Sequence, residues 1–384
     1  MKQKSEAEEI VPLKNVMDIY NRRYGPGTIT LGETKLDPPR MPVGIFAVDF
    51  AIGGGLPIWS TTNLWGPEGG GKSTMALQAV ATSQNYCWTC YHPVKYCLCE
   101  KGPSLKDSVW GNVEGTFDKE WAEAVGVDTK RVYVADLDYG EQYFNALESV
   151  LRSPECGLVV IDSIAALISE AEFDAPSEDQ FIGKSARLWT AGVKKLRQRL
   201  NRERKVGHSC ALVLTNQVRV KIGVAYGDPE TQPGGWAVKH ENHLLLRCGR
   251  KSLSKEKDSR YIDGERNKEM AARQTFTIRK DKIVTLQGSG EYIRLKEDIA
   301  THGLKKGMVD DSTTLMTYAK QYGVVTKGED GVLRYFKHKA KKEEDIKTLW
   351  KQKRDEYLRT CAEVINRARI KYGKGAIPRA DRSL

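Results

Sequence analysis

A glycine-rich run that ends in a lysine and two hydroxyl residues offers the clearest chemistry in this sequence. It is GPEGGGKST and consists of Gly66, Pro67, Glu68, Gly69, Gly70, Gly71, Lys72, Ser73 and Thr74. The run fits the pattern G-x-x-x-x-G-K-[ST], in which backbone N–H groups surround the phosphates of a nucleotide. In that pattern the lysine reaches the β- and γ-phosphates, and the Ser73 hydroxyl can bind Mg²⁺. The sequence therefore predicts a site for a nucleoside triphosphate and Mg²⁺.

Two acidic residues further along the chain could complete this site. Asp162 ends the apolar run LVVID, where a carboxylate can hold the water shell of Mg²⁺. Glu114 follows the strand-like run SVWGNV, at the same edge of a parallel sheet, and could orient an attacking water. Each has an ordinary alternative, because a strand-end Asp often caps the next turn and a lone Glu is commonly a solvated surface residue.

Four of the eight cysteines lie within the run CWTCYHPVKYCLC. Cys87, Cys90, Cys97 and Cys99, with His92 as a substitute ligand, could hold a tetrahedral Zn²⁺ and so fold a segment too small to have its own core. Four protein ligands leave no open coordination position, so this zinc would be structural. The alternative is a surface loop with free thiols.

These residues need a scaffold, and the hydrophobic pattern predicts one. From about residue 41 to 300, apolar runs such as RVYVAD and GLVVIDSIAAL alternate with helical patterns such as SARLWTAGVKKLRQRLNRER. The apolar runs are typical of strands buried on both faces of a parallel sheet. The pattern predicts an α/β fold in which the phosphate loop joins a strand to a helix.

The chain divides into three parts. Residues 1–40 contain a helical pattern, LKNVMDIYNRRYG, and a brief strand pattern, TITLG, so we expect a small helix–strand module there. Residues 41–300 form the core, with 86–106 as a cysteine-rich insertion. Residues 301–384 should form a small α+β domain: a helix, a hairpin turning at 328–330, and one long basic amphipathic helix within EEDIKTLWKQKRDEYLRTCAEVINRARIKYG.

The positive charge is concentrated near the C-terminus. The formal net charge is +11, and the last 54 residues alone hold 16 Lys and Arg against 7 Asp and Glu. This excess favours a polyanionic partner, nucleic acid before membrane, although a solvated helical surface is the plain alternative. The sequence contains neither a long apolar run nor a secretory signal pattern, so we expect a cytoplasmic protein without a membrane partner.

One segment between two apolar strand patterns is rich in glycine and proline. It lies within LTNQVRVKIGVAYGDPETQPGGWAV, residues 214–238, and begins with Arg219 and Lys221. Long loops without regular structure inside compact domains are usually functional. We interpret it as a mobile loop with a partner, the alternative being a surface loop without one.

Taken together, these motifs resemble the bacterial RecA recombinase family over about residues 10–335. GPEGGGKST, VVIDSIAAL, AIGGGLP, NQVRVKIGVAYGDPETQPGG and GVVTKGEDGVLRYF occur in the order of that family. The resemblance implies a RecA-type P-loop ATPase core, with a mostly parallel central sheet flanked by helices. It also implies an ATP-dependent recombinase that forms a helical filament on single-stranded DNA and exchanges it with homologous duplex DNA in DNA repair. Residues 1–40 would then be the polymerisation module.

The resemblance also implies roles at the nucleotide site. Lys72, Ser73 and Asp162 would bind ATP and Mg²⁺. Glu114 matches the catalytic glutamate that activates water. Trp121 lies where the family places an aromatic ring against adenine, with Asp118 beside it. Lys280 and Lys282 match paired lysines that reach the ATP of the neighbouring subunit; alone, they would be ordinary surface lysines.

Gln217 matches a glutamine that senses the γ-phosphate, and the mobile segment begins one residue later. ATP could therefore order this segment and hydrolysis release it. The DNA-facing segments implied are 174–187 and 218–235, which supply Lys184, Arg187, Arg219, Lys221, Gly223, Gly234 and Gly235. Positive side chains and backbone N–H groups suit a protein that binds the DNA phosphates without recognising the base sequence.

The sequence departs from the family pattern in two places, the cysteine-rich insertion and a C-terminus that is basic where the family often has acidic residues. Two other function classes were weighed. A ring helicase or translocase of the same fold would need an arginine finger in place of Lys280 and Lys282. A non-enzymatic DNA-coating protein would be expected to have lost Lys72, Glu114 or Asp162.

Overall fold

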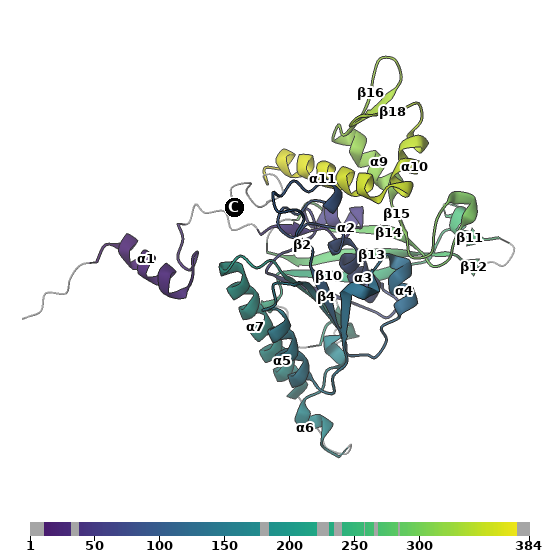
Figure 1. Ribbon diagram of the computed structural model, residues 1–384. Helices are drawn as coiled ribbons and strands as arrows, with labels where there is room; N and C mark the ends of the chain where they lie inside the picture. The colour runs from purple at the N-terminus through teal and green to yellow at the C-terminus, as the bar shows by residue number, and fades with distance from the viewer. Residues whose placement is uncertain are drawn as a thin grey trace, which may run out of the picture.

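The structure is a computed structural model of the chain (Figure 1). It describes residues 11–31, 38–176, 184–220, 230–233, 240–256, 258–264, 268–282 and 285–374. Among these residues, no helix combines the length and apolar character that a membrane span requires.

A nine-stranded sheet forms the centre of the molecule, in the order β15-β14-β13-β10-β3-β7-β6-β4-β5. The strands from β10 to β5 run parallel, and β13, β14 and β15 extend the sheet antiparallel beyond β10. Their bounds are β3 (Thr61–Gly66), β4 (Asp107–Asn112), β5 (Val132–Ala135), β6 (Cys156–Asp162), β7 (Ala211–Gln217), β10 (Leu244–Lys251), β13 (Ala271–Asp281), β14 (Ser289–Leu295) and β15 (Val309–Asp310). The predicted mostly parallel α/β sheet is confirmed.

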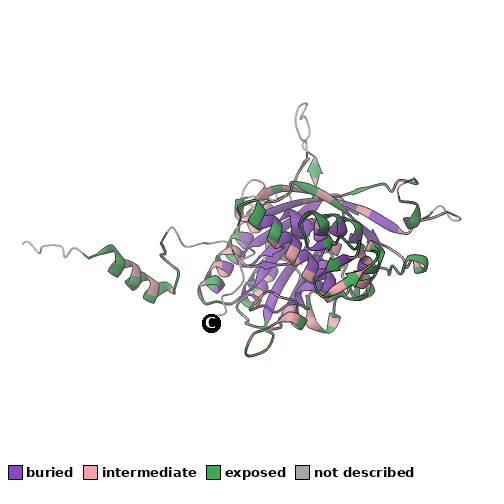
Figure 2. Cartoon of the chain, turned by 90° about the horizontal axis from the view of Figure 1, so that it is seen from above, coloured by how far each residue is buried: buried purple, intermediate pink, exposed green. Residues whose placement is uncertain are grey.

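Helices cover both faces of this sheet. Figure 1 shows α5 (Gly140–Val150) beside α7 (Lys184–Lys205) at one face, while α3 (Lys72–Ser83) and α4 (Lys119–Val125) lie at the other. Alternate residues of β6 follow this division, since Val159 and Ile161 join the hydrophobic cluster of α5 and α7, whereas Leu158 and Val160 join that of α3. Figure 2 shows the resulting buried interior.

The amphipathic pattern of α7 explains its packing. Its buried apolar residues are Trp189, Val193, Leu196 and Leu200, whose spacing of three and four places them on one helix face. Exposed residues of this helix include Lys194 and Lys195.

The remaining elements are short and mostly lie around the sheet. The helices are α1 (Leu13–Tyr24), α2 (Phe46–Ala51), α6 (Glu170–Phe173), α9 (Ser312–Gln321), α10 (Glu343–Gln352) and α11 (Arg354–Lys371). The strands are β1 (Arg40–Met41), β2 (Leu56–Pro57), β8 (Arg219–Val220), β9 (Glu230–Thr231), β11 (Ile262–Asp263), β12 (Lys268–Glu269), β16 (Val325–Lys327), β17 (Leu333–Tyr335) and β18 (His338–Ala340).

The first helix stands apart from the rest. Within Leu13–Tyr24, all of which the structure describes, no residue is buried, and Figure 1 shows α1 away from the sheet. The strand predicted from TITLG is wrong for its described part, because residues 28–31 form no strand; Gly32 lies outside the described residues.

Two further predictions need correction. The run RVYVAD was expected to be buried on both faces, but β5 is the edge strand, and Tyr133 and Val134 are 64% and 44% exposed. The single long C-terminal helix is in fact two helices, α10 and α11, separated at Lys353, whose φ of −123° and ψ of 91° are extended. Both helices pack on α9, while α10 also contacts β18 and α11 also contacts α2.

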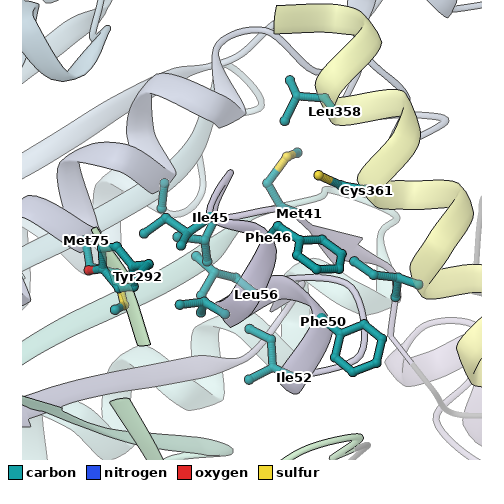
Figure 3. Close-up of a cluster of buried hydrophobic side chains, with 14 of the residues drawn as sticks. Met41, Ile45, Phe46, Phe50, Ile52, Leu56, Met75, Tyr292, Leu358 and Cys361 are labelled. Carbon is teal, nitrogen blue, oxygen red and sulfur yellow. The ribbon is translucent and has the colours of Figure 1, made fainter. Parts of the chain in front are cut away.

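The C-terminal helices pack on the core. Trp350 of α10 contacts Tyr335 of the β16–β18 sheet, with the ring centroids 5.8 Å apart. Leu358 and Cys361 of α11 face the hydrophobic cluster around Met41, as Figure 3 shows. One hydrophobic cluster thus extends from Met41 to Ala368.

Candidate functional site

The glycine-rich loop lies at the carboxyl end of β3 and leads directly into α3. Gly66 has a φ of 148°, and a Cβ added there would lie 2.1 Å from the carbonyl oxygen of Cys248. Gly71 precedes α3 in a left-handed conformation with a φ of 82°. Both positions therefore require glycine, and the loop leaves the N–H groups of the first turn of α3 pointing toward a site for phosphates.

Lys72 extends over this loop. Its Nζ donates to the carbonyl oxygens of Gly66 at 3.0 Å and Pro67 at 2.9 Å. The ammonium group is thus held above the loop by neutral acceptors, which phosphate oxygens could replace without a change of fold. The predicted position of Lys72 is consistent with phosphate binding.

Asp162 and Ser73 meet beneath the loop. The Ser73 hydroxyl donates to Asp162 Oδ1 at 3.1 Å, and the Thr215 hydroxyl of β7 donates to the same oxygen at 2.5 Å. Burial raises the pKa of Asp162, although the hydrogen bonds from Thr215 and Ser73 oppose that shift. Hydroxyl and carboxylate oxygens are the donors that Mg²⁺ prefers, so this pair fits the ion. Thr215 was not predicted.

Glu114 follows β4 and lies exposed at the same edge of the sheet. Its Oε1 accepts a hydrogen bond from the Ser163 hydroxyl at 2.7 Å, and Gln217 Nε2 lies 3.5 Å from the same oxygen. The structure therefore places Glu114 and Gln217 next to each other. It also adds Ser163, for which the sequence analysis predicted no role. Two side-chain donors fix the orientation of one carboxylate.

Trp121 lies against the start of α3. Its indole Nε1 donates to Thr74 Oγ1 at 3.1 Å, and Lys306 Nζ lies 5.8 Å from the centre of its ring. Asp118 caps α4, because its Oδ1 accepts from the backbone N–H of Trp121 at 2.9 Å. The aromatic ring is thus beside the phosphate loop, and Asp118 orients the helix that presents it.

Gln274 of β13 is a site residue that the sequence analysis missed. With its amide nitrogen toward the loop, it donates to the carbonyl oxygens of Gly70 at 2.8 Å and Gly249 at 3.1 Å. Gln274 is buried and holds the loop from below. No signal in the sequence marks it, because the contact joins segments about 200 residues apart.

Lys280 and Lys282 lie far from the phosphate loop of their own chain. Their Nζ atoms are 3.3 Å and 3.1 Å from the carbonyl oxygen of His240. Lys280 pairs with Leu245 at the beginning of β10, whereas the loop follows the opposite end of the neighbouring β3. Burial and the charge of Lys282 lower the pKa of Lys280. The two ammonium groups share one acceptor, and they do not contact the phosphate loop of their own chain in the part of the chain that the structure describes.

The structure describes two parts of the glycine- and proline-rich segment, residues 214–220 and 230–233. Arg219 pairs with Thr231, and both lie beyond the end of β7. Gln232 is buried, and its Oε1 accepts from Asn63 Nδ2 at 2.9 Å. The two described parts are therefore attached to β7 and β3, the strands next to the nucleotide site.

The other predicted DNA-facing residues are placed only in part. Arg187 is exposed on α7 and Arg219 is exposed in β8. The side chain of Lys184 and the residues Lys221, Gly223, Gly234 and Gly235 lie outside what the structure describes.

The four clustered cysteines converge on one point. Their Sγ atoms all lie within 4.8 Å of one another, with Cys87 and Cys99 separated by 3.8 Å and Cys90 and Cys97 by 3.7 Å. His92 is turned to the backbone, since its Nδ1 lies 3.0 Å from the carbonyl oxygen of Cys90. The predicted ligand set is thus assembled by the fold.

The surroundings of Cys87 favour its thiolate, whereas those of Cys90 and Cys99 favour the neutral thiol. Burial raises the pKa of Cys87, but the N–H groups of Cys90, Thr89 and Ser104 outweigh burial and lower it to about 7. Burial also raises the pKa of Cys90 and Cys99. Since a metal ion binds thiolates and lowers their pKa, a cluster that is costly to ionise alone suits a cation at its centre.

Comparison with known proteins gives consistent matches. The family model described as the RecA N-terminal domain matches residues 12–290. The chain is 29% identical to Protein RecA of Cytophaga hutchinsonii over 349 residues, which cover 90% of this chain and 91% of that protein. It is 28% identical to Protein RecA of Trichormus variabilis over 364 residues, 93% of this chain and 92% of the other. With Protein RecA of Thermus aquaticus it shares 35% identity over 237 residues, 61% of this chain and 63% of the other.

Proposed function

Because the chain belongs to the RecA family, we propose that it is an ATP-dependent DNA recombinase of the cytoplasm. It would polymerise on single-stranded DNA and exchange that strand with homologous duplex DNA in recombinational repair. The observation that carries this proposal is the contact between Gln217 and Glu114, because it joins the nucleotide site to the start of the predicted DNA-binding segment.

The residues at the site have distinct roles in ATP hydrolysis. Lys72 and the N–H groups of the glycine-rich loop bind the phosphates, and Ser73 and Asp162 hold Mg²⁺. The ion, when bound, neutralises charge on the phosphate oxygens. Glu114 accepts a proton from the attacking water as a general base. Trp121 provides a flat apolar surface for the adenine ring.

Gln217 would couple nucleotide to DNA. A γ-phosphate near Gln217 Nε2 competes with Glu114 for this donor, and a shift of Gln217 moves Arg219, two residues along the chain. Arg219 and the predicted Lys221 would contact DNA phosphates, while Arg187 and Lys184 would do so from the second segment. ATP therefore acts here chiefly as an allosteric ligand.

A second copy of the chain would complete the assembly. Lys280 and Lys282 lie at the opposite sheet end from their own phosphate loop, and they would bind the triphosphate of a neighbouring subunit. Residues 1–40, whose helix α1 has no buried residue, would be the polymerisation module. Residues 41–300 would be the ATPase core and 301–384 the C-terminal domain.

We also propose that the cysteine-rich insertion, residues 86–106, binds one structural Zn²⁺ through Cys87, Cys90, Cys97 and Cys99. The convergence of the four Sγ atoms supports this. Metal analysis of the purified protein tests it, and the double variant Cys87→Ser, Cys90→Ser is expected to lose the ion.

A strand-exchange assay with ATP tests the main proposal. The wild-type protein is expected to exchange strands, Lys72→Ala to fail, and Lys255→Ala, a matched change at an exposed lysine, to behave as the wild type. Absence of DNA-stimulated ATPase activity would favour a DNA-coating protein. Closed rings in place of fibres in electron micrographs would favour a translocase.

A further inference from the structure

The cysteine-rich insertion lies between two parts of the molecule that are far apart in sequence. It contains one short 3₁₀ helix, Val94–Tyr96, directly before Cys97. Its largest apolar side chains, those of Tyr86, Trp88 and Tyr91, are buried and belong to the hydrophobic cluster of the core. The insertion therefore contributes to a core outside itself, and short-range backbone hydrogen bonds such as that from Val94 N to Asn85 O at 2.9 Å shape the loop around its cysteines.

One side of the insertion is bound to the central sheet. The Trp88 ring lies over Gly157 of β6, where an added Cβ would come within 2.5 Å of it. Tyr91 and Ser209 join their hydroxyl groups by a hydrogen bond of 2.6 Å. Lys106 Nζ donates to the carbonyl oxygen of Ser209 at 2.8 Å. This side therefore rests on β6 and on the segment just before β7.

The other side contacts α11. Tyr96, next to the ligand Cys97, donates its hydroxyl to Glu356 Oε1 at 3.0 Å. Lys95 Nζ lies 3.8 Å from Asp355 Oδ2. The guanidinium of Arg359 lies 5.3 Å from the centre of the Tyr96 ring. Three neighbouring residues of α11 thus meet one turn of the insertion.

Glu356 extends this contact to the hairpin of β17 and β18. The Glu356 side chain is buried. The Tyr335 hydroxyl of β17 donates to the backbone carbonyl oxygen of Glu356 at 3.0 Å, and His338 Nε2 of β18 lies 3.8 Å from Glu356 Oε1. Arg359 also lies 3.9 Å from the centre of the Phe336 ring, at the turn of the hairpin. The contacts of Tyr96 therefore bear on both α11 and the hairpin.

We infer that a Zn²⁺ held by the four cysteines acts as a brace that fixes the first turns of α11 and the β17–β18 hairpin to the ATPase core. This inference rests on the zinc site proposed above. The ion fixes Cys97, Cys97 fixes the turn that carries Lys95 and Tyr96, and that turn holds Glu356 and Arg359. Without the ion, Trp88 keeps its place on the sheet, but the turn at Tyr96 is released.

Hydrogen exchange with and without zinc tests the brace in the full-length protein. Removal of zinc by a chelator should speed amide exchange in residues 333–340 and 354–360 at least about tenfold, the effect of one hydrogen bond to a charged group. Exchange in β3 and β7 should stay unchanged. If zinc is bound but its removal leaves 333–340 and 354–360 unchanged, the brace is wrong and the zinc site stands. If the purified protein binds no zinc, both fail.

A single substitution separates the brace from general unfolding. Tyr96→Phe removes one hydroxyl and no ligand, so the protein should keep one zinc per chain while exchange in 354–360 rises about tenfold. Tyr133→Phe, at an exposed tyrosine of the edge strand β5, is the matched control and should change neither. Exchange in Tyr96→Phe equal to that of the control would overturn the inference.

Discussion

The contact between Gln217 and Glu114 allows a direct test of how nucleotide and DNA are coupled. Gln217 ends β7, is exposed, and has its Nε2 3.5 Å from Glu114 Oε1. Gln217→Ala removes this amide and leaves the buried part of β7, the glycine-rich loop and Lys72 in place. We therefore expect the variant to bind ATP and to lose the effect of ATP on DNA affinity.

The expected effect of ATP on DNA affinity follows from the hydrogen bond that Gln217 donates. A hydrogen bond between a neutral amide and a charged oxygen contributes about 1.5–3 kcal/mol. In the wild-type protein, moving this donor from Glu114 to the γ-phosphate can bias the DNA-binding segment by at most that amount. This corresponds to a ratio of DNA affinities, with and without the γ-phosphate, of about 10- to 150-fold. Gln217→Ala should reduce the ratio to within about twofold of one.

Fluorescence anisotropy of a labelled oligonucleotide measures this ratio in the apo protein, with ADP and with a non-hydrolysable ATP analogue. Gln287→Ala, a change of the same type at an exposed residue remote from the site, should keep the full ratio. A Gln217→Ala protein whose affinities differ between the three states as much as those of the wild type would refute the coupling role. Equal affinities in the wild-type protein itself would refute the whole scheme.

Further predictions concern the site, the core and the charged surface. Lys72→Ala should abolish ATP turnover, measured by phosphate release, with the melting temperature unchanged to within a few degrees. Burial raises the pKa of Asp162, so its carboxylate becomes protonated at a higher pH than that of a free Asp. As the pH is lowered, Mg²⁺-dependent nucleotide affinity should therefore begin to fall at a pH above the ordinary pKa of Asp. Asp162→Asn should remove this pH dependence together with Mg²⁺ binding. Trp88→Ala should destabilise the protein by about 3–5 kcal/mol in denaturant titrations, since Trp88 is 2% exposed. If the basic C-terminal region binds duplex DNA, the double variant Lys337→Glu, Lys339→Glu should weaken binding and reduce the slope of log K against log salt by about 2 or more; an unchanged slope would refute that role.

The Lys337→Glu, Lys339→Glu variant is a better test of the basic C-terminal region than a deletion. Deleting residues 340–384 would remove the basic run, but it would also remove α11. Tyr357 of α11 is buried and donates to Asp311 Oδ2 at 2.7 Å, and Arg369 NH1 donates to the carbonyl oxygen of Gly53 at 2.8 Å. A truncated chain would therefore lose core contacts together with charge. Charge reversal at the exposed Lys337 and Lys339 leaves these buried contacts in place.

The phosphate loop and its partners could be predicted because their chemistry constrains local sequence. Glycine is required where a Cβ would strike Cys248, and a carboxylate after an apolar strand ends at a known edge of a parallel sheet. Thr215, Ser163 and Gln274 could not be predicted in the same way. Each acts through side-chain hydrogen bonds to segments distant in the sequence, and many residue types can make such bonds. Their positions follow from strand order, which local patterns do not determine.

The errors at the level of secondary structure have a similar cause. RVYVAD has the composition of a buried strand. In the described sheet, however, β5 is the last strand on one side and pairs with β4. The continuous helical pattern of residues 343–373 is interrupted at Lys353, which is extended, although no Pro or Gly lies near it to mark the break. In both places tertiary contacts decide between states that the local sequence favours equally.

The two lysines at the end of β13 show how sheet topology bears on assembly. Lys280 is level with Leu245 and, across β10, with Asn63 of β3, three residues before Gly66. Three residues of strand span about 10 Å, and the phosphate loop lies beyond that. Lys280 is therefore displaced from the loop of its own chain toward the amino ends of the parallel strands, and we expect that the lysines and this loop do not share one triphosphate. If both bind ATP, the second surface must come from another copy, joined through two different faces. Such a head-to-tail contact repeats without limit unless its rotation closes, so micrographs that show either fibres or rings measure that rotation directly.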